Sequence, residues 1–227
     1  MTDGWTQVVR HQLGLGRLLP LGGAGDGAWI AEEAAEAVLR RAVRDLRGVR
    51  VESLRIALAD PESVDEPVVP PPPSALPPGP LRVSAQFAAT AEDPLPTTAA
   101  RLRSGLATGA TDLLGLTVAE VDLKVTALLD EGPQAGPVRQ HEPPPSAETE
   151  GDPVAEAALA VPGVVRVTAA LGRAVPGAAA LPRRHVRVEV AVDANHRALD
   201  VARAVRERVG RVLPDHPTVA VLVTAVG

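Results

Sequence analysis

The chain has 227 residues, of which 45% are hydrophobic and 22% charged, and its formal net charge is −5. The hydrophobic share is ordinary for a globular protein, whereas the acidic balance argues against non-specific binding to nucleic acid or to an anionic membrane surface. Because the chain has no cysteine, it has no disulfides, thiolate metal sites or cysteine nucleophiles.

The hydrophobic residues are unusual in kind, because only Trp5, Trp29 and Phe87 are aromatic. Alanine, valine and leucine must therefore fill the core. Valine favours strands, while alanine and leucine favour helices. This composition predicts a mixed αβ protein.

Residues 1–27 form an N-terminal segment with a set of candidate partner-binding side chains, namely Trp5, Leu13, Leu15, Leu18 and Leu19. An amphipathic piece of this kind can bind a membrane surface or a partner groove. Alternatively it folds back and covers a sheet or helix face. We favour the second interpretation, because Gly14 and Gly16 weaken any helix there.

A glycine cluster ends this segment, at residues 22–27. A phosphate cradle is commonly placed in this way before a helix. The cluster lacks the Lys-Ser/Thr of a P-loop, and no apolar strand of useful length precedes it. We therefore interpret it as a flexible joint.

Residues 28–130 carry the periodicities of a first module. The predicted elements are a helix over 31–46, a strand over 54–58, a strand over 81–87, a helix from 97 or 98 to 114 and a strand over 121–125. An insertion at 60–80 holds nine of the 23 prolines, which exclude a helix interior or a central strand. We predict that it is a mobile loop between two adjacent antiparallel strands, so that deleting 64–78 would change the melting temperature little.

A second proline-rich, acidic stretch, residues 131–151, is predicted to link this module to a second one at 152–227. The second module has a helix over 154–160, strands over 165–171 and 186–192, a helix over 198–212 and a strand over 219–226. The last strand is apolar on both faces, which predicts a central or covered position.

The two halves follow the same order of elements, so the predicted fold class is α+β. We expect two tandem α-β-β-α-β modules, each a three-stranded sheet with helices on one face. Modules this small bury a modest fraction of their surface, so we expect them to pack together or to oligomerise.

The second module resembles the alkaline-shock-protein family of bacterial envelope stress proteins. The resemblance rests on residues 157–165, 186–190, 201–209 and 219–226, whose order and spacing fit along about 75 residues. The first module fits more loosely, with Arg47 where the family usually has proline, as a degenerate tandem copy. The opening, 5–22, is also similar to uncharacterised actinobacterial chains, some labelled as a nucleopolyhedrovirus family, although nothing physical supports a viral role.

The resemblance implies a non-catalytic binding and assembly protein of the envelope stress response. Such a protein gathers beneath the membrane through a partner, either a small membrane anchor or related stress proteins, and self-association is a further expectation. No secretory signal and no window of about 20 apolar residues is visible. We therefore expect a cytoplasmic protein that lies peripherally at the inner face of the membrane without spanning it.

The candidate sites are otherwise few. The five histidines show no metal-ligand spacing, and we predict no metal and no cofactor. A small basic patch, Arg183, Arg184 and His185, enters a predicted strand and is a second candidate partner-binding element. No serine, carboxylate or histidine arrangement suggests catalysis, so we predict that the chain is not an enzyme.

Two other binding functions compete with this one. A ferredoxin-like small-ligand-binding or regulatory module has the same α-β-β-α-β core, and the absence of cysteine argues against its metal-handling form. A KH-like nucleic-acid module would need a basic surface and a Gly-x-x-Gly clamp, and the sequence has neither.

Overall fold

A computed structural model describes residues 16–130, 146–147, 151–171 and 184–227. Its elements are β1 (Leu18–Leu21), β2 (Ala28–Ala31), α2 (Glu32–Ala42), β3 (Val49–Leu58), β4 (Leu81–Thr90), α3 (Leu95–Thr108), the π-helix η1 (Gly109–Leu114), β5 (Val118–Leu129), α4 (Pro153–Leu159), β6 (Val164–Val167), β7 (His185–Val192), α5 (Ala198–Val212) and β8 (Thr218–Val226). This architecture confirms the prediction of a mixed α+β protein.

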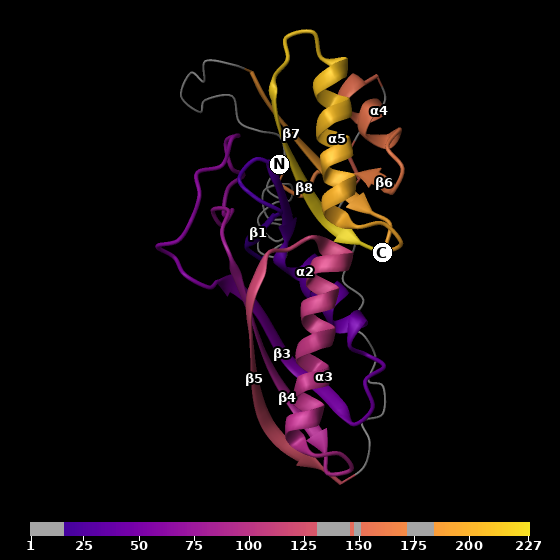
Figure 1. The fold of residues 1–227 in the computed structure, drawn as a ribbon. Helices are drawn as coiled ribbons and strands as arrows, with labels where there is room; N and C mark the ends of the chain where they lie inside the picture. Colours follow the sequence, from indigo (N-terminus) through magenta and orange to yellow (C-terminus); the bar gives the residue numbers. More distant parts are fainter. Residues whose placement is uncertain (1–15, 131–145, 148–150, 172–183) are drawn as a thin grey trace, which may run out of the picture.

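The strands form two sheets that lie one above the other in an elongated molecule (Figure 1). The lower sheet has the order β3-β4-β5, and the upper sheet has the order β1-β2-β8-β7-β6. In each half a β-hairpin is followed by a helical crossover to a parallel strand: β3 and β4 are antiparallel and β5 is parallel to β4, while β6 and β7 are antiparallel and β8 is parallel to β7.

The upper sheet corrects the expectation of two three-stranded sheets. Strands β1 and β2 come from the beginning of the chain, and β2 pairs in parallel with β8, so that this sheet has five strands. The predicted strand over 219–226 is confirmed as central, because β8 lies between β2 and β7. Its residues from Val219 to Thr224 are all buried.

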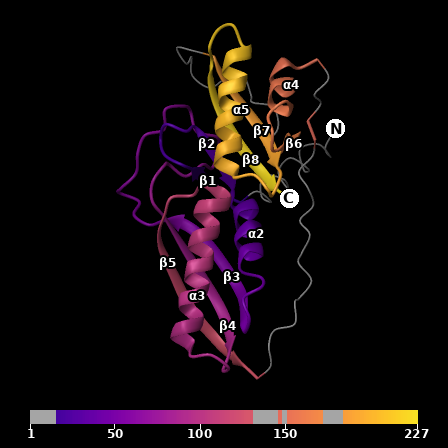
Figure 2. The ribbon, with the colours of Figure 1, turned by 45° about the vertical axis from the view of Figure 1, so that its right-hand side comes forward.

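Helices cover one face of the lower sheet, where α2 and α3 lie side by side (Figure 2). The burial of β4 alternates accordingly: Leu81, Val83, Ala85 and Phe87 are buried, whereas Ser84 and Gln86 are exposed. In α2 the apolar stripe is buried, and the helix has glutamates in its first turn and arginines in its last turn, as the helix dipole prefers. The buried hydrophobic residues of both sheets form one continuous core.

The glycine cluster is the turn of the β1–β2 hairpin and is not a joint between modules. The side chain of Asp26 accepts a hydrogen bond from the N–H of Gly23 at 2.8 Å. Gly22 and Gly27 have φ angles of 72° and 57°, a left-handed conformation that glycine adopts at little cost. Six residues with two such glycines let the chain reverse and pair Leu21 with Ala28.

The proline-rich insertion does connect two adjacent antiparallel strands, β3 and β4, as predicted. The prediction that it is loosely attached was wrong, because its second half packs on the N-terminal hairpin. Leu18 donates to the carbonyl of Ser74 at 3.2 Å, and Leu76 donates to the carbonyl of Leu18 at 2.8 Å. The indole N–H of Trp29 donates to the carbonyl of Leu76 at 3.2 Å, and Val69 is 3% exposed.

Two adjacent valines test this packing with the same substitution. Val69→Ala removes two buried methyl groups and is expected to lower the free energy of unfolding by about 1.5 kcal/mol. Val68 is 56% exposed, and Val68→Ala is expected to cost less than about 0.5 kcal/mol. Urea unfolding of both variants measures the difference, and equally small effects would mean that the loop is not packed.

Candidate functional site

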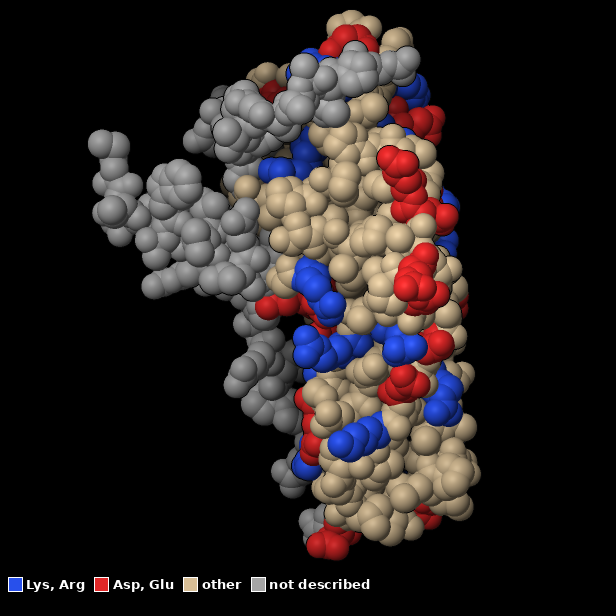
Figure 3. Space-filling view, turned by 90° about the vertical axis from the view of Figure 1, so that its left-hand side faces the viewer, with Lys and Arg blue, Asp and Glu red and all other residues tan. Residues whose placement is uncertain are grey.

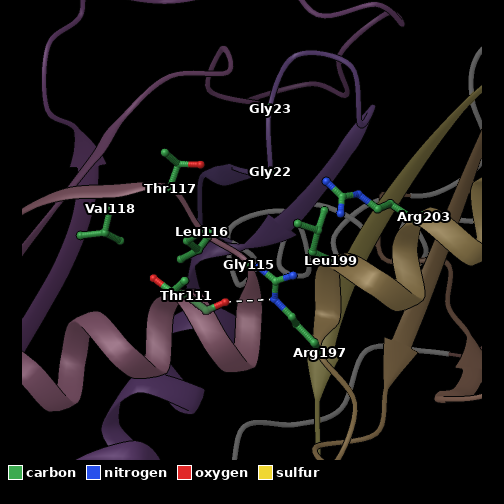
Figure 4. A pocket seen from close by; sticks show the side chains of 10 residues that line it. All are labelled: Gly22, Gly23, Thr111, Gly115, Leu116, Thr117, Val118, Arg197, Leu199 and Arg203. Carbon is green, nitrogen blue, oxygen red and sulfur yellow. Dashed lines mark hydrogen bonds between the residues drawn. The ribbon is translucent and has the colours of Figure 1, made fainter.

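A hollow of about 430 Å³ lies where the two halves meet. Three segments build it: the turn after β1, the end of η1 with the residues that follow it, and the beginning of α5 (Figure 4). The lining residues are Gly22, Gly23, Thr111, Gly115, Leu116, Thr117, Val118, Arg197, Leu199 and Arg203. In the described part of the chain, this is where cationic and hydroxyl side chains converge from both halves.

The π-helical turn explains how the first of these arginines is held. The N–H of Gly115 donates to the carbonyl of Ala110 at 3.0 Å, five residues back, so that the carbonyl of Thr111 is left without its usual helical donor. Nε of Arg197 donates to this carbonyl at 3.0 Å (Figure 4), and its Nη1 lies 3.3 Å from Asp200. Arg197 thus ties the start of α5 to the end of η1.

The second arginine is held by the hairpin turn. Arg203 donates to both carboxylate oxygens of Asp26, at 2.7 and 3.1 Å. Burial alone would raise the pKa of Asp26, but the hydrogen bonds from Arg203 and Gly23 and the charges of Arg203 and Arg206 together hold it below its ordinary value. Asp26 is therefore ionised at neutral pH and neutralises the guanidinium beside it.

Guanidinium and hydroxyl groups around a hollow are suited to binding an anion. Here both guanidinium groups already have partners within the protein, so an anion would have to compete with Asp26 and Asp200. The hydrogen bond from Arg197 to the Thr111 carbonyl joins the halves, together with the hydrogen bond from the Gly22 N–H to the Gly115 carbonyl at 3.0 Å. The hollow therefore marks the contact between the turn after β1, η1 and the start of α5, and we call this contact the joint.

The sheet edges present a second kind of site, because an uncovered edge can pair with another chain. The edge at β1 is covered by the backbone of residues 74–76. At the opposite edge of the same sheet, Ala147 donates to the carbonyl of Val167 at 3.0 Å. Both ends of the upper sheet therefore carry a covering segment.

In the lower sheet, arginine side chains cap the edge at β3. Arg40 donates to the carbonyl of Val51 at 3.1 Å, and Arg17 donates to the carbonyl of Ile56 at 2.7 Å. Arg17 is itself held in place by an ion pair with Glu32 at 2.9 Å. These guanidinium groups occupy acceptors that another strand would need.

The edge at β5 is different. It is the outer strand of the lower sheet, twelve residues long, and no described backbone segment pairs with its outer side. Of its outward carbonyls, that of Val121 accepts from Nε of Arg103 at 3.2 Å. Val125 and Leu128 are 39% and 61% exposed. A long strand with exposed apolar side chains is a template for pairing.

Figure 3 shows the side of the molecule along which β5 runs. Positive and negative side chains are interspersed on this face, and its lower part is largely uncharged above acidic side chains at the lowest tip. The last part of β5 was missed in the sequence, where the strand was expected to end at Val125. The signal that could have found it is the uninterrupted apolar run at Ala127–Leu129, without proline or glycine.

Of the sequence-predicted site residues, the structure describes Leu18, Leu19, Arg184 and His185, and it places the two leucines in β1 and the other two at the start of β7. Leu18 and Leu19 are buried in β1, at 1% and 0% exposure, so they are not accessible to a partner. Their segment folds back onto the protein and adds a strand pair to the upper sheet. Trp5, Leu13, Leu15 and Arg183 lie outside the described residues.

The basic patch is also reduced. Arg184 lies 3.6 Å from Asp215. Burial, followed by the charge of Arg187, lowers the pKa of His185, whose Nδ1 shares a hydrogen bond with the hydroxyl of Thr218 at 2.9 Å. His185 is therefore mainly neutral at neutral pH, so the two described members of the predicted patch are an ion-paired arginine and a mainly neutral histidine.

Glu189 is the most buried carboxylate described, at 5% exposure. Arg187 donates to it at 3.1 Å and the N–H of Leu171 donates at 3.1 Å. Burial nevertheless raises its pKa. No cluster of three metal-ligating side chains occurs among the described residues.

Comparisons with known proteins give no match: no family model fits the chain, and no curated protein or solved structure is similar to it. Within the described ranges, no helix has the length and apolar character needed to cross a membrane.

The joint can be tested at a glycine. Gly115 has a φ of 88°, and a Cβ there would clash with the Cβ of Leu199. Gly151 also has a positive φ, of 75°, but no atom lies within 4 Å of its Cβ position. Gly151→Ala is expected to cost about 1 kcal/mol of stability for the left-handed backbone.

Gly115→Ala is expected to cost a further 1 to 3 kcal/mol, roughly the penalty of overpacking a core. Thermal unfolding followed by circular dichroism compares the two variants. Equal losses would contradict close packing between η1 and α5.

Glu189 predicts a pH dependence. Its pKa is raised above the ordinary value of 4.5, so its ionisation is less favourable in the folded protein than in the unfolded chain. Its contribution to stability is full below the unfolded pKa and is lost as pH rises through the folded pKa. The stability of the wild type relative to Glu189→Gln is therefore expected to fall as pH rises from about 4 to about 7.

The measurement is the melting temperature of the wild type and of Glu189→Gln over this range of pH. Subtracting one from the other cancels the effects of the titratable groups that both proteins share. A difference that stays constant or grows with pH would show that the pKa of Glu189 is not raised.

Proposed function

We propose that this chain is a non-catalytic binding and assembly protein, and that strand β5 is its binding element. The observation that carries the proposal is the contrast between the sheet edges: a backbone segment meets the edge at β1 and, at Val167, the edge at β6, and two arginines cap β3, whereas the twelve residues of β5 expose Val125 and Leu128 and have one described cap, Arg103 on the Val121 carbonyl. Strand addition at a free edge supplies backbone hydrogen bonds, and side-chain pockets add specificity.

The envelope stress response is the cellular setting that we propose. The support is the resemblance of residues 152–227 to the alkaline-shock-protein family. The common order of α2-β3-β4-α3-β5 and α4-β6-β7-α5-β8 supports the further proposal that the chain is a degenerate tandem repeat of one module. In this proposal the protein is cytoplasmic and reaches the inner face of the membrane through a protein partner, with no direct span.

A regulatory module that binds a small anion is the alternative, and the hollow at the joint is the observation that favours it. It is the weaker of the two proposals. Arg203 is already in a two-pronged ion pair with Asp26, and Arg197 bonds the Thr111 carbonyl. These partners also argue against catalysis at the hollow, because no side chain there is set beside a base or an activated nucleophile.

The structure changes how the N-terminal segment should be tested. Removing residues 1–21 would delete β1, whose side chains are buried, and would destabilise the upper sheet. A deletion of residues 1–15 leaves all described strands in place. It therefore separates a binding role of Trp5, Leu13 and Leu15 from a loss of folding.

The proposal predicts that an exposed charge on β5 abolishes partner recovery. Val125→Lys places an ammonium group on the free edge, where it disfavours strand addition. Val165→Lys is the matched control, because Val165 is 56% exposed in the short strand β6 of the upper sheet. The measurement is quantitative affinity purification of the full chain from envelope-stressed bacteria, with the membrane fraction kept.

Val125→Lys is expected to lower the amount of recovered partner about tenfold or more, and Val165→Lys to retain it. Both variants should unfold at the wild-type temperature within a few degrees, because both side chains are exposed. If partner recovery is the same for all three proteins, β5 is not the binding element.

A further inference from the structure

We propose that β5 pairs antiparallel with β5 of a second copy of this chain, with Leu123 opposite Leu123 on a two-fold axis. The two lower sheets would then form one continuous six-stranded sheet. This inference rests on the proposed function, since it names the partner of the same edge. Three features of β5 support this pairing: the direction of its backbone groups, the charges on its open face and the apolar side chains on its helix-covered face.

The backbone groups set which residues can pair. The carbonyl of Val121 accepts from a side chain, Arg103, and therefore points away from β4. In a strand, alternate residues point the same way, so that Leu123 and Val125 also direct their N–H and C=O groups outward. An antiparallel pair centred on Leu123 places Leu123 of one copy opposite Leu123 of the other, and Val121 of each copy opposite Val125 of the other. The two residues of each facing pair can exchange two backbone hydrogen bonds.

The charges select this register. With Leu123 on the axis, Lys124 of each chain lies directly opposite Asp122 of the other chain, and the pair occurs twice. Both side chains are exposed, and Asp122 keeps only a long contact of 3.4 Å with Arg82, which is closer to Glu120 at 2.6 Å. Opposite charges facing each other across two strands stabilise the pairing, and like charges destabilise it.

The neighbouring registers are worse. An axis through Asp122 would place two aspartates opposite each other, and an axis through Lys124 would place two lysines opposite each other. An axis through Val121 would bring Asp122 against Glu120. The sequence Asp122-Leu123-Lys124 is thus self-complementary in charge about Leu123, and Glu120 faces the uncharged Thr126.

The apolar side chains agree with the same register. Val121, Leu123 and Val125 pair with Val83, Ala85 and Phe87 of β4, which are buried under the helices. They therefore lie on the helix-covered face at its margin, and Val125 is still 39% exposed. Pairing would place the three residues against the same three of the second copy.

One contact opposes the pairing. In the single chain, Arg103 holds the Val121 carbonyl, and the Val125 N–H of the second copy has to replace it. A strand pair of about six residues also buries less surface than a standard interface. The dimer is therefore weak and concentration-dependent, and its strength depends on the charge pairs.

Light scattering coupled to size exclusion, with the full chain over a range of concentrations, measures the association. Lys124→Glu places a carboxylate opposite Asp122 twice and is expected to raise the dimer dissociation constant about tenfold or more. Asp122→Lys is expected to do the same. The double variant, with the charges exchanged, is expected to return to within a few-fold of the wild type.

Because the chain has no cysteine, a disulfide can test the register directly. Asp122→Cys and Lys124→Cys would lie directly opposite each other, about 4.5 Å apart between Cα atoms, which suits a disulfide. When both chains carry the same substitution, the two cysteines would be diagonal neighbours about 7 to 8 Å apart. A mixture of the two variants, one carrying a mass tag, is therefore expected to cross-link as the mixed pair under mild oxidation, and each variant alone is not.

The outcomes separate this inference from the proposed function. A chain that stays monomeric at all concentrations, or a disulfide that forms equally within each variant, overturns the two-fold pairing. The binding role of β5 then still stands if Val125→Lys loses a different protein partner. A wild-type dimer that neither charge variant weakens also overturns the register.

Discussion

The structure depends on the parallel pairing of β2 with β8. This pairing joins residues near positions 30 and 220 and places the N-terminal hairpin in the sheet of the second half. Trp29, the larger of the two described aromatic side chains, is 1% exposed there, and its indole N–H bonds the proline-rich loop. Because α2 follows β2 without a connecting loop, the same strand fixes where the first half begins. The two halves therefore share one core instead of being linked domains.

This arrangement also decides which sheet edges remain free. The hairpin extends the upper sheet, and the loop that it holds covers the new edge at β1. Arg17, next to the hairpin, is held by Glu32 at the start of α2 and caps a carbonyl of β3. Of the two edges of the lower sheet, β3 is thus capped by arginines, whereas at β5, on the far side, the one described cap is Arg103 on the Val121 carbonyl. The binding role that we propose thus follows from how the rest of the fold is closed.

Local patterns predicted most of the elements, because alternating or helical spacing is a property of neighbouring residues. The strand over 186–192 and the helix over 198–212 agree with β7 and α5 within one residue. The hairpin strand β1 was missed, because Leu18–Leu21 is four residues long and contains proline. Its pairing depends on partners far away in sequence, and no local pattern records such a contact.

The candidate site was predicted less well for the same reason. Val121–Val125 was identified as a strand, but whether a strand lies at an edge depends on the order of the strands in the sheet. Leu18 and Leu19 were candidate partner-binding residues, whereas the favoured interpretation was that their segment folds back, and the structure buries both. From the sequence alone, the arginines that cap β3 could equally have been solvated. Only the tertiary arrangement brings Arg17 and Arg40 to backbone carbonyls.

The most direct test of the shared core is whether both halves unfold together. Replacing Trp5 by phenylalanine leaves Trp29 as the only tryptophan, so that its fluorescence reports on the upper sheet while far-ultraviolet circular dichroism reports on both sheets. If β2 joins the halves into one cooperative unit, the two urea unfolding curves will coincide in midpoint and slope. A circular dichroism curve with a second transition that the fluorescence of Trp29 does not follow would contradict this account.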